Sequence, residues 1–249
     1  MKPLVQRRRF VAYAIAAPRS GGHSLAGALS GACRSAHRPT PGLLAQWTLD
    51  LAAGVLTHDD VRQRFQRRDR ELWLEFETSN LLEPFLTDLV ELMPDARFVL
   101  AIRDPADWLR SYVDYQILET SSRVMQSVRR LRFGPPDASR PVEEAAMAER
   151  GLFPVDRYLA WWAQYHRNAL SAIPDARLLL LRTDEISARL DDIADFLGLD
   201  PSTVDAGRSH RGQARRQTGL VDALPPGFVA DRVRTHAGDL VARFFPNDA

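Results

Sequence analysis

The sequence predicts an α/β domain of three layers, with a central parallel sheet and helices on both of its faces. Segments with helical spacing of apolar residues alternate with apolar runs of strand length at 10–17, 72–77, 97–102 and 178–182. The first and third runs are almost continuously apolar, as expected for strands buried on both faces. Two units also share a pattern, because the stretch from Met93 to Arg103 resembles the stretch from Ile173 to Arg182.

Composition is that of one large globular domain, and we treat 1–249 as a single unit. The chain is 45% hydrophobic and 26% charged, which is ordinary for a folded protein with a substantial core. Its net charge of +1 gives no general field for nucleic acid, so any anion site must be local. No run approaches the ~18 apolar residues that a membrane span needs.

The expected location is cytoplasmic. Cys33 is the single cysteine, which excludes an internal disulfide and fits a reducing compartment. Arg7, Arg8 and Arg9 precede the apolar run at 10–17 and imitate a secretory signal. We reject that interpretation, because the run is short and cleavage would remove the first strand.

A loop that binds an oxyanion is predicted between the first strand and the first helix. The segment reads Pro18-Arg-Ser-Gly-Gly-His-Ser24, so the strand ends at a proline and the glycines permit a tight turn. N–H groups at the start of the following helix point at one spot, where an anion binds. The arginine adds a fixed positive charge, and the histidine and serine add donors. These residues alone leave open an ordinary strand-to-helix connection, since the Walker A pattern is absent.

The remaining segments are interpreted from their periodicity and turn residues. Residues 32–42 form a loop, and Asp104 caps a helix that Pro105 opens. Residues 119–155, rich in proline, form a mobile insertion or lid on the acceptor side. Residues 207–220 include five basic and no acidic side chains, which favours a basic loop beside an anionic ligand.

Ligands of parallel sheets bind at the carboxyl ends of the strands. Four charged residues stand at or just beyond predicted strand ends, and several of them could meet in one crevice: Arg19, Glu77, Arg103 and Arg182.

Five segments follow one another along the chain: Pro18–Leu25, Phe76-Glu-Thr-Ser79, Phe98–Tyr112, Leu178–Asp184 and Asp195–Pro201. Together and in this order they resemble the sulfotransferases that use 3′-phosphoadenosine 5′-phosphosulfate (PAPS), most nearly the heparan-sulfate and bacterial carbohydrate type. The resemblance spans residues 10 to 202, nearly the whole chain.

This resemblance implies a P-loop-like fold and transfer of the sulfuryl group of PAPS to an acceptor hydroxyl, leaving adenosine 3′,5′-bisphosphate (PAP), without a metal ion. The acceptor would be a small molecule, a natural product or a carbohydrate. Glu77 would be the catalytic base, and Arg19 would stabilise charge on the leaving phosphate. The implied cofactor-binding residues are Arg19, Ser20, Gly21, Gly22, His23 and Ser24 for the phosphosulfate, and Arg103, Ser111, Arg211 and Gly212 for the 3′-phosphate.

Departures from the family pattern leave alternatives open. His23 replaces a threonine or serine and competes with Glu77 as base, and Glu75 is a further candidate. Arg19 replaces a frequent lysine and does not readily release a proton. Thr78 replaces the lysine that usually follows the glutamate. Two other functions also stay open: a nucleotide or small-molecule kinase, and a non-catalytic module that binds a nucleotide.

Overall fold

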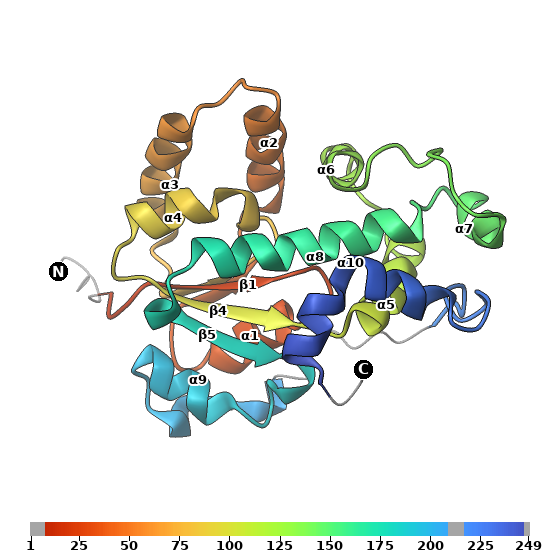
Figure 1. The fold of residues 1–249 in the computed structure, drawn as a ribbon. Coiled ribbons are helices and arrows are strands. Elements are labelled where there is room, and N and C mark those ends of the chain that lie inside the picture. Colours follow the sequence, from red (N-terminus) through yellow and green to blue (C-terminus); the bar gives the residue numbers. More distant parts are fainter. Residues whose placement is uncertain (1–7, 209–216, 247–249) are drawn as a thin grey trace.

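The computed structural model describes residues 8–208 and 217–246, and its centre is a five-stranded parallel sheet in the order β2-β3-β1-β4-β5. Figure 1 shows β1, β4 and β5 of this sheet. The strands are β1 (Ala12–Ala16), β2 (Ser35–His37), β3 (Phe76–Thr78), β4 (Arg97–Ile102) and β5 (Leu178–Arg182). Helices cover both faces, which confirms the predicted α/β class.

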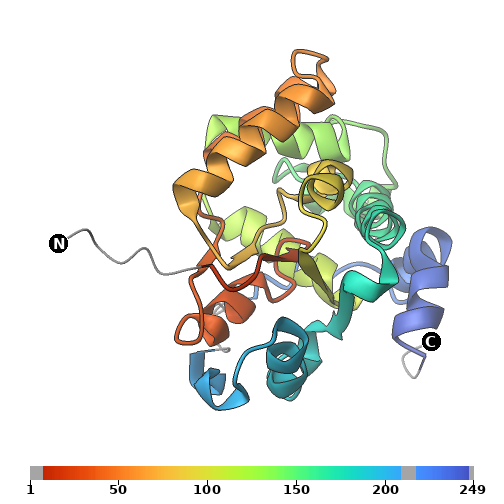
Figure 2. The same ribbon diagram turned by 90° about the vertical axis from the view of Figure 1, so that its left-hand side faces the viewer.

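The helices divide unequally between the two faces of the sheet (Figure 2). Helices α1 (Gly22–Leu29) and α9 (Leu190–Leu197) pack on one face. The other layer contains α2 (Pro41–Ala52), α3 (His58–Leu72), α4 (Leu86–Leu92), α5 (Pro105–Leu118), α6 (Arg123–Phe133), α7 (Ala145–Ala148), α8 (Val155–Ala172) and α10 (Phe228–Phe244). Within the described chain, no helix has the length and apolar character needed to cross a membrane.

Alternation along β1 explains how both layers fit the same strand. Tyr13 and Ile15 belong to the large core beneath the second layer, whereas Ala12, Ala14 and Ala16 belong to the core shared with α1. Because successive side chains of a strand point to opposite faces, one face of β1 carries only methyl groups. Helix α1 therefore packs directly against the central strand.

Strand β3 is shorter and later than predicted. A capping box between Thr57 and Asp60 starts α3, and the helix continues for 15 residues to Leu72. Trp73 then ends it in the left-handed conformation, at φ 49°. The last turn of α3 thus takes Leu72 out of the predicted strand, and the sheet begins at Phe76.

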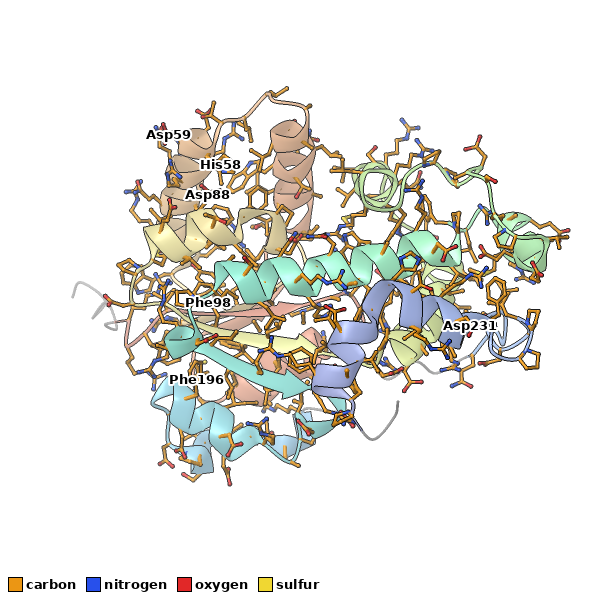
Figure 3. All side chains as sticks on the ribbon, viewed as in Figure 1. His58, Asp59, Asp88, Phe98, Phe196 and Asp231 are labelled. Carbon is orange, nitrogen blue, oxygen red and sulfur yellow. The ribbon has the colours of Figure 1, made fainter. Side chains whose placement is uncertain are left out.

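Helices α3 and α4 are joined by a polar contact at their surface. His58 of α3 and Asp88 of α4 point toward one another (Figure 3), with 2.8 Å between Nδ1 and Oδ2. Arg62 also donates to the other oxygen of Asp88, at 2.9 Å.

Three segments differ from, or add to, the sequence interpretation. Strand β2 lies inside the predicted loop 32–42 and pairs with β3 in parallel register. The segment 119–155 contains α6 and α7, with buried Val128, Phe133 and Met147. Helix α10, to which we assigned no element from sequence, packs on α8 and α5. A lid role for 119–155 stays a prediction.

Candidate active site

A cavity of about 830 Å³ lies at the carboxyl ends of the strands. Its walls come from the β1–α1 loop, the residues after β2, β3, β4 and β5, one side of α5 and α6, and residues 217–222. The position agrees with the general rule for ligands of parallel sheets. Segments far apart in sequence therefore meet at one place.

The β1–α1 loop has a conformation that requires glycine. Arg19 and Gly21 both have positive φ, 69° and 85°. A Cβ atom at Gly21 would overlap Cδ1 of Ile186. No side chain caps the first turn of α1, so Gly22 and His23 bring backbone N–H groups without a capping partner to the cavity wall.

Two side chains from β4 and α5 hold this loop by its carbonyl groups. Trp108 Nε1 donates to the carbonyl of Pro18 at 2.8 Å, and Arg103 Nη1 donates to that of Arg19 at 3.1 Å. Carbonyl groups are thus turned toward the scaffold, which is the arrangement that favours an anion on the amide side of the loop.

Arg103 and Ser111 reach the same cavity from β4 and α5. Asp104 accepts from the backbone N–H groups of Ala106 and Asp107 at 2.9 Å, so α5 starts directly after the strand. Ser111 lies two turns into this helix, where its Oγ accepts from Nε of Arg19 at 3.2 Å. Burial lowers the pKa of Arg103, whereas the carboxylate of Asp107 raises it by more than the charge of Arg19 lowers it. Arg103 and Arg19 bring two guanidinium groups to the same cavity wall, which suits an anionic ligand.

Three carboxylates line the cavity, and hydrogen-bond donors bound to each of them weaken their repulsion of an anionic ligand. Asp107 and Asp222 both accept from Arg110, at 3.0 and 2.7 Å. Asp114 accepts from the backbone N–H of Thr218 at 3.0 Å and from its hydroxyl group. In the ranges that the structure describes, no three or more His, Cys, Asp or Glu side chains gather as a metal site.

The model of the sulfotransferase domain family matches residues 14–205, which include the loop, Arg103 and Ser111. The chain belongs to this sulfotransferase family. It is accordingly a transferase enzyme, and its acceptor is not determined by this match.

Solved structures share the fold of this sulfotransferase at low sequence identity. The sulfotransferase from Alicyclobacillus acidocaldarius is 17% identical, with a TM-score of 0.53 over 97% of this chain and 99% of the other. Sulfotransferase STF9 from Mycobacterium avium is 12% identical, with a TM-score of 0.56 over 96% and 78%. A search of curated proteins found no match.

Most of the predicted binding residues of this sulfotransferase come together. The cavity wall includes Arg19, Gly21, Gly22, His23, Ser24, Arg103 and Ser111. Ser20 is buried below the loop instead, and Arg182 turns away to pair with Asp184 at 2.8 Å. Arg211 and Gly212 lie outside the described residues.

The expectation that Glu77 faces the crevice is corrected by the structure. Its carboxylate is 3% exposed and accepts two hydrogen bonds from Arg68 of α3, at 2.6 and 2.7 Å. Arg68 is itself 5% exposed. Strand alternation puts Glu77 on the side of β3 that α3 covers, while its neighbour Thr78 turns toward Gly22.

Glu75, the other predicted carboxylate base, also lies outside the cavity wall. It accepts from the backbone and side chain of Arg9 and from the backbone N–H of Arg34. Burial disfavours its charge, but these hydrogen bonds outweigh burial and lower the pKa of Glu75 to about 2. Because Glu75 does not line the cavity, its carboxylate is out of reach of an acceptor hydroxyl bound there.

Two imidazoles line the cavity, which neither Glu77 nor Glu75 does. His23 was predicted from sequence, and His37, which follows β2, was missed because that strand was interpreted as loop. Their rings lie edge to face with centroids 5.2 Å apart. Burial, then the neighbouring His23 and Arg38, lower the pKa of His37 to about 4, so its ring is neutral at pH 7.

Hydrogen bonds define the tautomer of His37. The Thr78 hydroxyl donates its one proton to the carbonyl of Gly22 at 2.9 Å. The 2.7 Å contact between Thr78 Oγ1 and His37 Nδ1 must therefore be donated by the histidine. Nε2 of His37 is then the ring atom with a lone pair.

Proposed function

We propose that this sulfotransferase transfers the sulfuryl group of PAPS to the hydroxyl group of a small-molecule, natural-product or carbohydrate acceptor, leaving PAP. The observation that carries the proposal is the meeting of two anion-binding groups in one cavity. One is the β1–α1 loop, and the other is Arg103 with Ser111, eight residues later on α5. The hydrogen bond from Arg103 to the carbonyl of Arg19 joins the two groups.

The donor set fits PAPS, which carries one cluster of negative charge at each end of its ribose. The loop residues, with Arg19, His23 and Ser24, would hold the phosphosulfate, and Arg103 and Ser111 would hold the 3′-phosphate. Bound PAPS supplies a sulfuryl group attached to a phosphate leaving group. Arg19 would stabilise the negative charge that collects on this phosphate.

A proton must leave the acceptor hydroxyl as its oxygen attacks sulfur, and we assign that proton to Nε2 of His37. The neutral ring, the donated Nδ1–H and the place in the cavity wall support this assignment. His23 is the second candidate, since it shares the wall and contacts the His37 ring. A cytoplasmic location, supported by the single cysteine, stays a prediction.

The first test is calorimetric binding of PAP to the wild type and to Arg103→Ala. We expect the variant to bind at least about 10-fold more weakly, because a charged hydrogen bond to phosphate contributes ~1.5–3 kcal/mol. Arg182→Ala is the matched control, since Arg182 also ends a strand but lies outside the cavity wall. Equal PAP affinity in the two variants would remove the 3′-phosphate assignment.

An assay of labelled sulfate transfer from PAPS to an acceptor distinguishes a sulfotransferase from the two alternatives, a kinase and a non-catalytic nucleotide-binding module. Turnover without ATP or magnesium supports the proposal. A requirement for ATP with magnesium would instead favour a kinase, and PAP binding without any transfer would favour a non-catalytic module.

A further inference from the structure

The order of the strands gives the cavity a direction. Arg103 follows β4 and the phosphosulfate loop follows β1, its neighbour on the side away from β5. A nucleotide that spans these two points has its 3′-phosphate toward β4 and its sulfuryl group toward β1. In-line attack on sulfur then comes from beyond β1, where the ends of β3 and β2 line the same cavity.

Three arginines surround this far end. Arg38 directly follows β2, and Arg129 and Arg132 stand on α6. Met125, Arg129 and Arg132 are spaced by four and three residues, so they share one face of α6, and all three line the cavity. Arg38 Nη2 contacts Sδ of Met125 at 4.0 Å, which joins the two groups.

These arginines have no carboxylate partner among the residues that the structure describes. The charge of Glu83 acts on Arg132, but Glu83 accepts a hydrogen bond from Asn168 at 2.7 Å and forms no ion pair with this arginine. Arg110, at the nucleotide end of the same cavity, is in contrast paired with both Asp107 and Asp222. Arg38, Arg129 and Arg132 therefore bring three guanidinium groups without a described carboxylate partner to the far end of the cavity.

Neutral contacts hold two of these side chains in place. Arg132 Nη2 donates to the carbonyl of Asn80 at 3.1 Å, and its guanidinium lies 4.8 Å from the Trp161 ring centroid. Arg129 lies 5.9 Å from the ring of Tyr115, and Arg19 lies 5.8 Å from the same ring. Tyr115 thus contacts both Arg19 of the phosphosulfate loop and Arg129 of the arginine cluster. Such contacts orient a guanidinium without neutralising it.

Arg38 adds a second sign of a missing partner. Its backbone is held in the left-handed region at φ 49°, with the N–H donating to the carbonyl of Thr78 at 2.8 Å. Its Nε is buried without a hydrogen-bond partner. A buried guanidinium N–H without a partner is destabilising unless a ligand supplies an acceptor.

We propose that the acceptor of this enzyme is a hydroxyl-bearing organic anion whose carboxylate, sulfate or phosphate group is bound by Arg38, Arg129 and Arg132. The inference rests on the proposed function, because that function defines which end of the cavity receives the acceptor. Planar guanidinium groups match the paired oxygens of these anions. The hydroxyl of such an acceptor lies toward the phosphosulfate loop, and its charge lies toward α6.

The test measures binding of matched acid and amide probes by ligand-observed NMR. The pairs are 4-hydroxyphenylacetate with 4-hydroxyphenylacetamide, and glucuronate with glucuronamide, each added to the free and to the PAP-loaded protein. We expect the acids to bind at least about 10-fold more tightly than the amides. Arg38→Gln and Arg129→Gln should each reduce this preference, and the double variant, in which Arg132 alone remains, should reduce it most.

Arg130→Gln is the matched control, because Arg130 is an exposed residue of the same helix that does not line the cavity. It should keep the full preference for acids. The melting temperature and PAP affinity of each variant show that fold and nucleotide site are intact. Absence of an acid preference in the wild type, or an undiminished preference in the double variant, overturns the proposal. Loss of PAP binding in the double variant also overturns it, because the arginines would then belong to the nucleotide. Failure of the wild type to bind PAP rejects the proposed function instead.

Discussion

At the scale of single residues, His37 shows how a hydroxyl group can determine the chemistry of a neighbouring ring. Thr78 has one proton and donates it to Gly22, so it can only accept from His37. A single threonine therefore selects the tautomer that leaves Nε2 unprotonated. Thr78 thus contacts Gly22 at the start of α1 through its donated proton and orients the His37 ring through its accepting oxygen.

His37→Gln tests this arrangement. Glutamine keeps a donor for Thr78 but accepts no proton at neutral pH, so we expect kcat to fall by ~10²–10⁴ with PAP affinity unchanged. Because the pKa of His37 is lowered to about 4, the proton-accepting form persists as pH falls. In the wild type, kcat/KM should therefore decrease only near pH 4.

His23→Gln provides the comparison for that measurement. If His37→Gln keeps its turnover and His23→Gln loses it, the base is His23. An acid limb near the ordinary histidine pKa of ~6.5 in the wild type would also contradict the assignment to His37.

At the scale of elements, the Arg68–Glu77 pair joins α3 to β3 in the interior. Both side chains are nearly fully buried and bonded through two hydrogen bonds. Each of two buried charges is tolerated in the interior only because the other compensates it. The pair thus determines how α3 lies on the sheet and which face of β3 carries the carboxylate.

Glu77→Gln should therefore affect stability before it affects chemistry. Loss of one partner leaves Arg68 buried with an uncompensated charge, and we expect the free energy of unfolding to fall by ~3–5 kcal/mol in urea titrations. The double variant Arg68→Met with Glu77→Leu should recover most of this loss. A stable Glu77→Gln protein with normal PAP binding and no turnover would instead restore Glu77 as the base.

Sequence reasoning located the elements whose signals are local. The glycine turn after β1 and the arginine after β4 each occupy a few consecutive residues, and both reach the cavity. Glu77 was misplaced because its orientation depends on the length of α3 and on a partner nine residues away. His37 was missed because β2 has three residues and becomes a strand only through pairing with β3.

At the scale of the whole molecule, one buried histidine makes stability depend on pH. His166 of α8 is fully buried, and its Nδ1 donates to the carbonyl of Trp162 at 2.7 Å. Burial lowers the pKa of His166 to about 4. Its unfolded pKa is ~6.5, so between these values the unfolded chain binds a proton that the folded chain does not.

Stability should consequently fall as pH decreases from about 6.5 toward 4. The expected slope from His166 is ~1.4 kcal/mol per pH unit in this window. Urea unfolding at pH 7, 6 and 5 measures the total slope, to which His37 contributes in the same direction because its pKa is also lowered to about 4. His166→Phe should reduce the slope by the contribution of His166, whatever its own stability. An equal slope in that variant would show that other groups are responsible.

The methyl-lined face of β1 lets helix α1 pack close to the central strand. Helix α1 rests on Ala12, Ala14 and Ala16, and the same helix carries the amides that face the sulfuryl donor in our proposal. A bulkier side chain at any of these alanines would lift the helix and move its amino end away from Arg103. Natural selection for catalysis in this enzyme must therefore also act on positions that have no reactive group at all.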